Sequence, residues 1–243
     1  MNSEEKKILI MFDMDHTILS ENSDSVILKL LSNEVMSELK LKQEVSDNWA
    51  NFMQEVYIKM KEENIKIEQI KEIVENIKLN KGFIELFEFI KHNEKYFEPI
   101  IISGANTLFL KWVLDKNNLN NLFKFYISNP AFPCDKHIIK IKQFHKHDCD
   151  RCDQAQCKGV IVKEFLQMKK ENNVTYSNII FIGDGLNDYC PSKIFNERDF
   201  LFPRLEFPLY RMLYNKGYVN KLKCNVHSWK DGFVIIDVIK KLL

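Results

Sequence analysis

Hydrophobic residues recur along the chain in short runs, each followed by polar or turn-forming residues. The runs that predict buried strands cover residues 8–12, 99–103, 125–128 and 178–183. Between them, residues 83–93 and 161–170 show the helical spacing of hydrophobic positions. Buried strands that alternate with helices predict an α/β fold with a doubly wound parallel sheet.

The interval from about residue 20 to about residue 80 breaks this alternation. It contains no strand pattern, but two stretches have hydrophobic residues at helical spacing. The first follows a possible N-cap at Ser46 and comprises Trp49, Phe52, Met53, Val56, Tyr57 and Met60; the second comprises Ile67, Ile70, Ile73, Val74 and Ile77. We therefore expect a helical cap domain, residues 19–80, inserted after the first strand of a core domain formed by residues 1–18 and 81–243.

Composition and charge narrow the class of protein. The 243 residues are 45% hydrophobic, enough for a substantial core, and the formal net charge of +1 gives no reason to expect binding to nucleic acid or to a membrane surface. Residues 1–7 are polar and include acids, unlike a secretory signal, and no apolar run reaches the roughly 18 residues of a spanning helix. These features predict a soluble, cytoplasmic protein.

Two aspartates follow the first apolar run. Asp13 and Asp15 are separated by one residue, so in an extended chain their side chains point the same way. Carboxylates held close together repel unless a cation or a shared proton lies between them. An ordinary turn is the alternative, because aspartate is common after strands.

Further polar residues follow two other predicted strands. Asp184 lies between Gly183 and Gly185 at the end of one run, with Asp188 four residues later as its support. Ser103, Gly104 and Asn106 end another run and offer hydrogen-bond donors and close backbone approach to a ligand. Since the carboxyl ends of parallel strands meet at one edge of the sheet, these groups predict one site, and Mg²⁺ suits its oxygen ligands.

The segments "DMDHT" (13–17), Ser103, a later lysine and "GDGLND" (183–188) resemble the phosphatase branch of the haloacid dehalogenase superfamily. The resemblance implies that Asp13 is the nucleophile and forms an aspartyl-phosphate, and that Asp15 is the general acid and then the base. Thr17 would steady the loop, and Ser103 would bind a phosphoryl oxygen. Asp13, Asp184 and the Asp15 carbonyl would hold Mg²⁺. His16 has no assigned role.

The same resemblance places a lysine before the strand that leads to Asp184. Lys158 opens a predicted helix there and is preferred over Lys163. The chemistry is consistent with phosphate esters, because expelling an alkoxide requires a proton donor such as Asp15, whereas expelling a halide does not.

Cysteines and histidines cluster just before Lys158. Cys149, Cys152 and Cys157 lie within thirteen residues of two histidines, a density that resembles a zinc knuckle. We expect a structural Zn²⁺ with His147 as the fourth ligand, His145 being the alternative; a reduced loop without metal is the other reading. Outside this segment, the cysteines at positions 134, 190 and 224 are interpreted as ordinary core or surface thiols.

The segments "ENSDS" (21–25), "YISNPAF" (126–132), "HKHDCDRCDQAQCK" (145–158) and "GDGLNDYCP" (183–191) resemble the phosphoethanolamine/phosphocholine phosphatase family. That family has a sister active on pyridoxal phosphate. The resemblance implies that Asp24 faces the substrate's ammonium group, although the residue could equally be a helix N-cap. The second such acid of the animal enzymes is replaced here by Gly104, so either Glu21 compensates or the substrate differs.

The sequence therefore predicts a Mg²⁺-dependent phosphomonoesterase that acts on a small phosphate ester beneath a helical cap. Phosphoethanolamine or phosphocholine is the preferred substrate, and pyridoxal 5′-phosphate is the alternative. A different class, a catalytically silent binding module that uses the cysteine–histidine segment, would have no use for Asp15.

Overall fold

The computed structural model describes residues 7–46, 48–134 and 138–243. Residues 1–6, on which the expectation about a secretory signal rests, lie outside this part of the chain. Within the described residues, no helix is long and apolar enough to cross a membrane.

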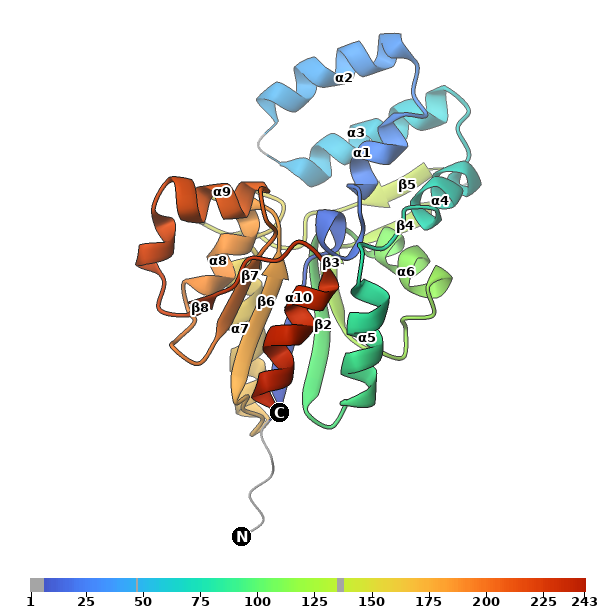
Figure 1. The fold of residues 1–243 in the computed structure, drawn as a ribbon. Coiled ribbons are helices and arrows are strands. Elements are labelled where there is room, and N and C mark those ends of the chain that lie inside the picture. The colour runs from blue at the N-terminus through green and yellow to red at the C-terminus, as the bar shows by residue number, and fades with distance from the viewer. Residues whose placement is uncertain (1–6, 47, 135–137) are drawn as a thin grey trace.

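A parallel sheet of six strands forms the centre of the fold, in the order β3-β2-β1-β6-β7-β8 (Figure 1). The strands are β1 (Ile8–Phe12), β2 (Phe97–Asn106), β3 (Tyr126–Asn129), β6 (Asn178–Gly183), β7 (Phe200–Pro203) and β8 (Asn225–Val226). The chain extends the sheet outward on one side of β1 and then starts the other side at β6. This reversal confirms the predicted doubly wound topology, and such folds bind ligands at the carboxyl ends of the strands where the order reverses.

Helices cover both faces of the sheet. Alternate residues of β1 enter two separate cores, with Ile8, Ile10 and Phe12 on one face and Leu9 and Met11 on the other. The first core includes α5 (Phe83–His92), α6 (Thr107–Lys116) and α10 (Gly232–Ile239), and the second includes α7 (Lys158–Glu171), α8 (Tyr189–Ser192) and α9 (Pro208–Asn215). Both faces being buried explains why β1 reads as an unbroken apolar run.

The interval between β1 and α5 is helical, as predicted. It contains α1 (Ser23–Leu28), α2 (Asn33–Val45), α3 (Trp49–Glu62) and α4 (Ile67–Glu75), and α1 to α3 lie beyond the carboxyl end of the sheet (Figure 1). The expected N-cap at Ser46 is wrong. Asn48 caps α3, because its side-chain oxygen accepts the Asn51 N–H at 3.1 Å.

The two connections to these helices run side by side. The Ser20 N–H donates to the Lys78 carbonyl at 2.8 Å, and the Asn80 N–H donates to the Ile18 carbonyl at 2.9 Å. An antiparallel hairpin, β4 (Ala131–Cys134) with β5 (Ile138–Ile141), packs against α3 from outside this interval. The division into domains at residues 18/19 and 80/81 stays a prediction.

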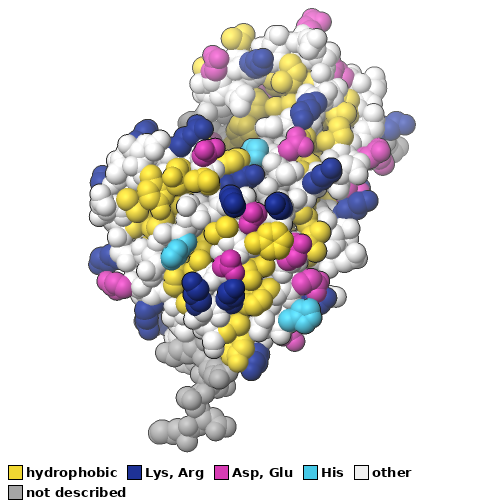
Figure 2. All heavy atoms as spheres, viewed as in Figure 1, with side chains coloured by type: hydrophobic (Ala, Val, Ile, Leu, Met, Phe, Trp, Pro, Cys, Tyr) yellow, Lys and Arg dark blue, Asp and Glu magenta, His cyan; other side chains and the backbone are white. Residues whose placement is uncertain are grey.

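Charged side chains of both signs are interspersed on the face shown in Figure 2, as the small net charge suggests. Hydrophobic side chains also reach the surface there over α5 and α10, which carry the exposed Ile84 and Phe233. Single exposed hydrophobic residues of this kind are normal on soluble domains. They carry no functional argument.

Candidate active site

A cavity of about 240 Å³ opens at the carboxyl ends of β1, β2 and β6. Most of the predicted catalytic and substrate-binding residues reach it. Its lining comprises Asp13, Asp15, His16, Asn22, Asp24, Trp49, Ser103, Gly104, Ala105, Asn129, Asp153, Ala155, Gln156, Asp184, Gly185 and Asn187. The cavity is therefore built from both the sheet and the helices above it.

Asp13 directly follows β1 and pairs with Lys158. The Lys158 Nζ lies 2.7 Å from Asp13 Oδ1 and 2.7 Å from Asp188 Oδ1, and the lysine side chain is fully buried. Burial alone lowers the pKa of Lys158, but the two carboxylates outweigh it and raise the pKa above its ordinary value. The predicted lysine thus keeps a positive charge beside Asp13. Lys158 reaches the cavity through its ion pair with Asp13, whereas no ion pair joins Lys163 to Asp13 or Asp188 among the described residues.

Asp184 directly follows β6 and lies beside these groups. Its Oδ1 accepts the Thr17 hydroxyl at 3.2 Å, and Asp188 Oδ2 accepts the N–H groups of residues 184 and 185, each at 2.9 Å. Carboxylate oxygens of Asp13, Asp184 and Asp188 all lie within 4.8 Å of one another. Thr17 therefore binds the Asp184 carboxylate, and Asp188 holds the backbone beside it.

This cluster fits a divalent metal ion. Burial and the neighbouring Asp13 and Asp188 raise the pKa of Asp184 to about 9, because Lys158 supplies a single positive charge against three carboxylates. A cation would relieve that repulsion, and a set of carboxylate oxygens suits Mg²⁺, which keeps several waters and needs few protein ligands.

Asp15 lies on the irregular turn Met14–Ile18, since β1 ends at Phe12 rather than continuing to Asp15. The turn, not strand alternation, therefore brings Asp13 and Asp15 to one cavity. Ser23 holds the Asp15 carboxyl through its N–H at 2.9 Å and its hydroxyl at 3.1 Å. Burial, followed by the charge of Asp24, raises the pKa of Asp15 to about 8, so this carboxyl carries a proton at neutral pH.

Two residues that the sequence did not single out brace this turn. Asn80 Nδ2 donates to the carbonyls of residues 16, 17 and 19, at 3.2, 2.7 and 2.9 Å. The Arg204 guanidinium donates to the His16 carbonyl and, at 3.1 Å, to Asn80 Oδ1. His16 has a positive φ of 55°, an uncommon backbone conformation for a non-glycine residue, and these contacts hold it there.

Asp24 also lines the cavity. The Trp49 indole N–H donates to its Oδ2 at 2.7 Å, and its Oδ1 has no hydrogen-bond partner among the described residues. Burial raises the pKa of Asp24 to about 6. Asn22, not Asp24, caps α1 by accepting the Ser25 N–H at 2.7 Å, so the N-cap interpretation of Asp24 is wrong.

The residues at the end of β2 separate into two groups. Ser103 and Gly104 line the cavity, as predicted. Asn106 is fully buried outside the lining, where its oxygen caps α6 at 2.9 Å from the Phe109 N–H and its amide donates to Tyr57 at 3.2 Å. Glu21 is also absent from the lining and pairs with Lys29 at the surface, 3.3 Å away. The structure therefore brings neither residue to the substrate.

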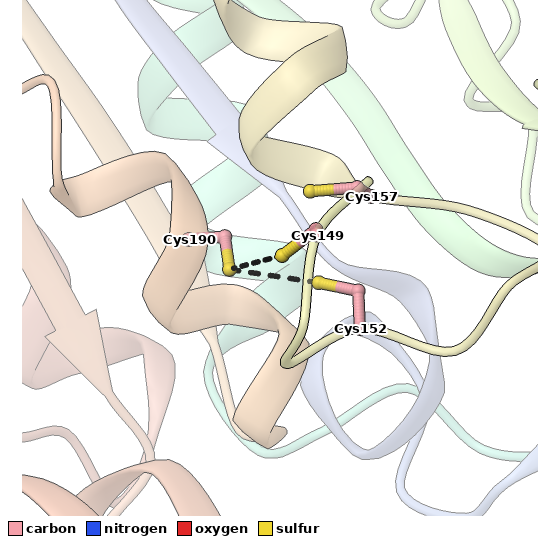
Figure 3. Close-up of side chains that lie close together, drawn as sticks. All are labelled: Cys149, Cys152, Cys157 and Cys190. Atoms are coloured by element: carbon pink, nitrogen blue, oxygen red, sulfur yellow. Dashed lines mark hydrogen bonds between the residues drawn. The ribbon is translucent and has the colours of Figure 1, made fainter. Parts of the chain in front are cut away.

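Four cysteines lie close together here, whereas the sequence predicted a group of three cysteines and a histidine. Sulfur atoms of Cys149, Cys152, Cys157 and Cys190 gather beside α7 and α8 (Figure 3). His147 instead accepts the Cys149 N–H through Nδ1 at 3.2 Å and donates from Nε2 to the Asp153 carbonyl at 2.9 Å. Cys190 therefore lies where a histidine was expected beside the three cysteines, and both ring nitrogens of His147 are used on the backbone.

Several further cavity residues had no signal in the sequence. Asp153 and Gln156 come from the cysteine segment, Asn129 is the last residue of β3, and Asn187 lies three residues after Asp184. Both polar atoms of the buried Gln156 amide lack a hydrogen-bond partner among the described residues. A buried amide without partners costs free energy, so this side chain is suited to bind a ligand in the cavity.

Comparison with known proteins connects this geometry to a family. The family model described as Putative Phosphatase matches residues 8–243. The chain belongs to this family. A pyridoxal phosphate phosphatase from Bos taurus is 34% identical, over 98% of this chain and 99% of its own length. A phosphoethanolamine/phosphocholine phosphatase from Gallus gallus is 29% identical, over 100% of this chain and 91% of its own length.

Solved structures confirm the haloacid dehalogenase-like fold. A phosphoserine phosphatase solved as a phospho-aspartyl intermediate analogue is 16% identical and superimposes with a TM-score of 0.62, covering 97% of this chain and 99% of that one. A haloacid dehalogenase family hydrolase from Salmonella enterica gives a TM-score of 0.64 at 15% identity, covering 100% of this chain and 74% of that one. At these identities the likeness concerns the fold.

Proposed function

We propose that this member of the Putative Phosphatase family is a Mg²⁺-dependent phosphomonoesterase that hydrolyses a small phosphate ester. The observation that carries the proposal is the pairing of two aspartates with opposite roles in one cavity. Asp13 lies against the buried Lys158, whereas burial keeps Asp15 protonated at neutral pH. The two environments thus suit Asp13 to act as the nucleophile and Asp15 to act as the acid.

The first chemical step forms a bond between a carboxylate oxygen of Asp13 and phosphorus and breaks the bond from phosphorus to the ester oxygen. The proton of Asp15 goes to that leaving oxygen. Lys158 balances negative charge at Asp13, and Ser103 lies at the cavity wall as a hydrogen-bond donor for a phosphoryl oxygen. Mg²⁺, when held by Asp13, Asp184 and the Asp15 carbonyl, supplies charge neutralisation of the phosphoryl group.

The second step reverses the role of Asp15. Its carboxylate takes a proton from a water molecule, the water oxygen bonds to phosphorus, and the bond between phosphorus and Asp13 breaks. Inorganic phosphate leaves and both aspartates return to their starting states. The hydrogen bonds from Ser23 hold Asp15 in place through both proton transfers.

The part of the cavity around Asp24 and Trp49 favours a cationic group on the substrate. The unpaired Asp24 oxygen offers a charged acceptor, and the Trp49 ring beside it offers a face suited to a cation. Phosphoethanolamine or phosphocholine carries such a group at one end and phosphate at the other. These are our preferred substrates.

Pyridoxal 5′-phosphate is the second candidate. The Bos taurus relative named for this substrate matches the chain at 34% identity, and Trp49 lines the cavity as a flat surface for an aromatic ring. Location in the cytoplasm and the absence of nucleic-acid and membrane partners stay predictions.

The test is release of inorganic phosphate with Mg²⁺ from phosphoethanolamine, phosphocholine, pyridoxal 5′-phosphate, phosphoserine and pyrophosphate. We expect release from at least one of the first three and none from the Asp13→Asn variant, which keeps the shape of the side chain. A folded wild-type protein that releases no phosphate from any of the five would favour the silent binding module.

A further inference from the structure

Four cysteines from two separate segments meet between α7 and α8 (Figure 3). Cys149, Cys152 and Cys157 come from the loop before α7, and Cys190 comes from α8. Their sulfur atoms all lie within 4.8 Å of one another. Cys190 Sγ is 3.7 Å from Cys149 Sγ and 3.5 Å from Cys152 Sγ.

These separations match a tetrahedral metal site. Zinc–sulfur bonds of about 2.3 Å in tetrahedral geometry place sulfur atoms roughly 3.8 Å apart. A disulfide would require about 2.05 Å, much shorter than the separations to Cys190. We propose that Cys149, Cys152, Cys157 and Cys190 bind one Zn²⁺ ion as a structural four-cysteine site.

The surroundings suit thiolate ligands and a closed site. Cys152, Cys157 and Cys190 are buried, and Cys149 is half-buried. Cys157 occupies the N-cap of α7, where the positive end of the helix dipole stabilises a thiolate. Four protein ligands leave no position for water, which is the pattern of structural rather than catalytic zinc.

The neighbouring histidines hold the backbone of the cysteine loop. His145 Nε2 accepts the Cys157 N–H at 3.1 Å, and His147 binds the Cys149 N–H and the Asp153 carbonyl. His145 thus binds the backbone through one ring nitrogen, and His147 binds it through both. The histidines shape the loop, and the metal ligands are the sulfur atoms.

The site ties together the parts of the chain that build the cavity. Lys158 immediately follows Cys157, and α8 immediately follows Asp188, which pairs with that lysine. The two segments approach so closely at Gly159 that a Cβ there would lie 2.9 Å from the carbonyl oxygen of Cys190. The same loop contributes Asp153 and Gln156 to the cavity.

Zinc would therefore fix the start of α7, and with it Lys158, relative to the loop that carries Asp184 and Asp188. Zinc binding itself does not depend on the proposed activity, whereas this positioning effect rests on it. Metal content separates the two: a zinc protein that lacks phosphatase activity would retain the site and refute only the proposed function.

The test is the zinc content of the full chain, purified under reducing conditions and measured by elemental analysis. We expect about one zinc per chain in the wild type and in His147→Ala, Cys134→Ser and Asp184→Asn. His147→Ala tests whether the histidine is a ligand, and Cys134→Ser tests the effect of removing a thiol outside the site. Asp184→Asn tests whether zinc binds adventitiously at the aspartates. Cys190→Ser and Cys152→Ser are expected to lose at least nine-tenths of the zinc.

A spectrum of the wild-type chain covers the case in which the cysteine variants do not fold. Replacing zinc by Co²⁺ should give the intense thiolate-to-cobalt absorption of a tetrahedral four-sulfur site, and a mercurial reagent should release the metal. A folded wild type without zinc, whose thiols react freely, would overturn the proposal. Loss of zinc in His147→Ala with retention in Cys190→Ser would overturn the ligand assignment.

Discussion

The Asp24→Asn substitution tests how the cavity recognises its substrate. It removes one negative charge and keeps the size of the side chain, and the remaining oxygen can still accept the Trp49 N–H. In the wild type, the unpaired Asp24 Oδ1 is available to an ammonium group. A hydrogen bond to such a charged group contributes about 1.5–3 kcal/mol.

That free energy sets the expected change in binding. Since about 1.4 kcal/mol corresponds to a factor of ten, KM for phosphoethanolamine should rise roughly 10- to 150-fold in the variant. A change in kcat that both esters share is expected as well, because the charge of Asp24 also raises the pKa of the acid Asp15.

Ethyl phosphate is the matched control, because it keeps the two-carbon chain and the phosphate but lacks the ammonium group. Steady-state phosphate release from both esters should show the rise in KM for phosphoethanolamine alone. Equal losses on both esters would mean that the substitution disturbs the cavity as a whole. No loss on either would refute the assignment of Asp24 to the cationic group.

The pH dependence gives an independent reading of the same contact. Because burial raises the pKa of Asp24 to about 6, its negative charge is present above that pH and is lost as the pH falls through it. The ratio of KM for phosphoethanolamine to KM for ethyl phosphate should therefore rise below about pH 6 more steeply in the wild type than in Asp24→Asn. The variant corrects for the phosphate groups of the two esters, whose own pKa values differ.

Three further substitutions test other contacts. Asp15→Asn should lower kcat for an alkyl phosphate by about 10²–10⁴-fold. The leaving group of p-nitrophenyl phosphate needs no proton, so this ester should still phosphorylate the variant. If rapid-quench experiments show equal rates of phosphorylation by the two esters, Asp15 is not the acid. Lys158→Met leaves Asp13 and Asp188 buried without their cation. The free energy of unfolding, measured with urea, should therefore fall by about 3–5 kcal/mol. An unchanged free energy of unfolding would contradict the buried ion pairs. The Gly104→Asp side chain fits the site, since a Cβ there meets only Asn187 at 3.6 Å. The added carboxylate should lower KM for phosphoethanolamine relative to ethyl phosphate by about tenfold. An unchanged KM ratio would mean that the cationic group binds elsewhere.

The core of the site could be predicted from the sequence because its residues follow apolar strands directly. Asp13 and Asp184 directly follow β1 and β6, which are neighbours in the sheet, so the topology alone brings them together. Lys158 could be chosen because it begins a helix just before β6. In each case, local sequence fixes the element and the parallel sheet fixes the position.

Other parts of the site depend on packing that a local pattern does not reveal. Cys190 lies 38 positions after Cys152 and meets it only because α8 packs against the start of α7. Asn106 shared the pattern of Ser103 and Gly104, but the chain turns into α6 there and uses its oxygen as a cap. Asn22 rather than Asp24 caps α1, and the Asp24 carboxyl lines the cavity instead.

The most direct test of the central claim is to find the phosphoryl group on Asp13. The Asp15→Asn variant should be mixed with Mg²⁺ and p-nitrophenyl phosphate, quenched in acid and digested, because loss of the base for water should let the intermediate accumulate. The account predicts a mass increase of one phosphoryl group on the peptide that contains Asp13, and none in a variant that also carries Asp13→Asn. Phosphorylation of another residue, or product release with no phosphoryl-protein at any time, would contradict it.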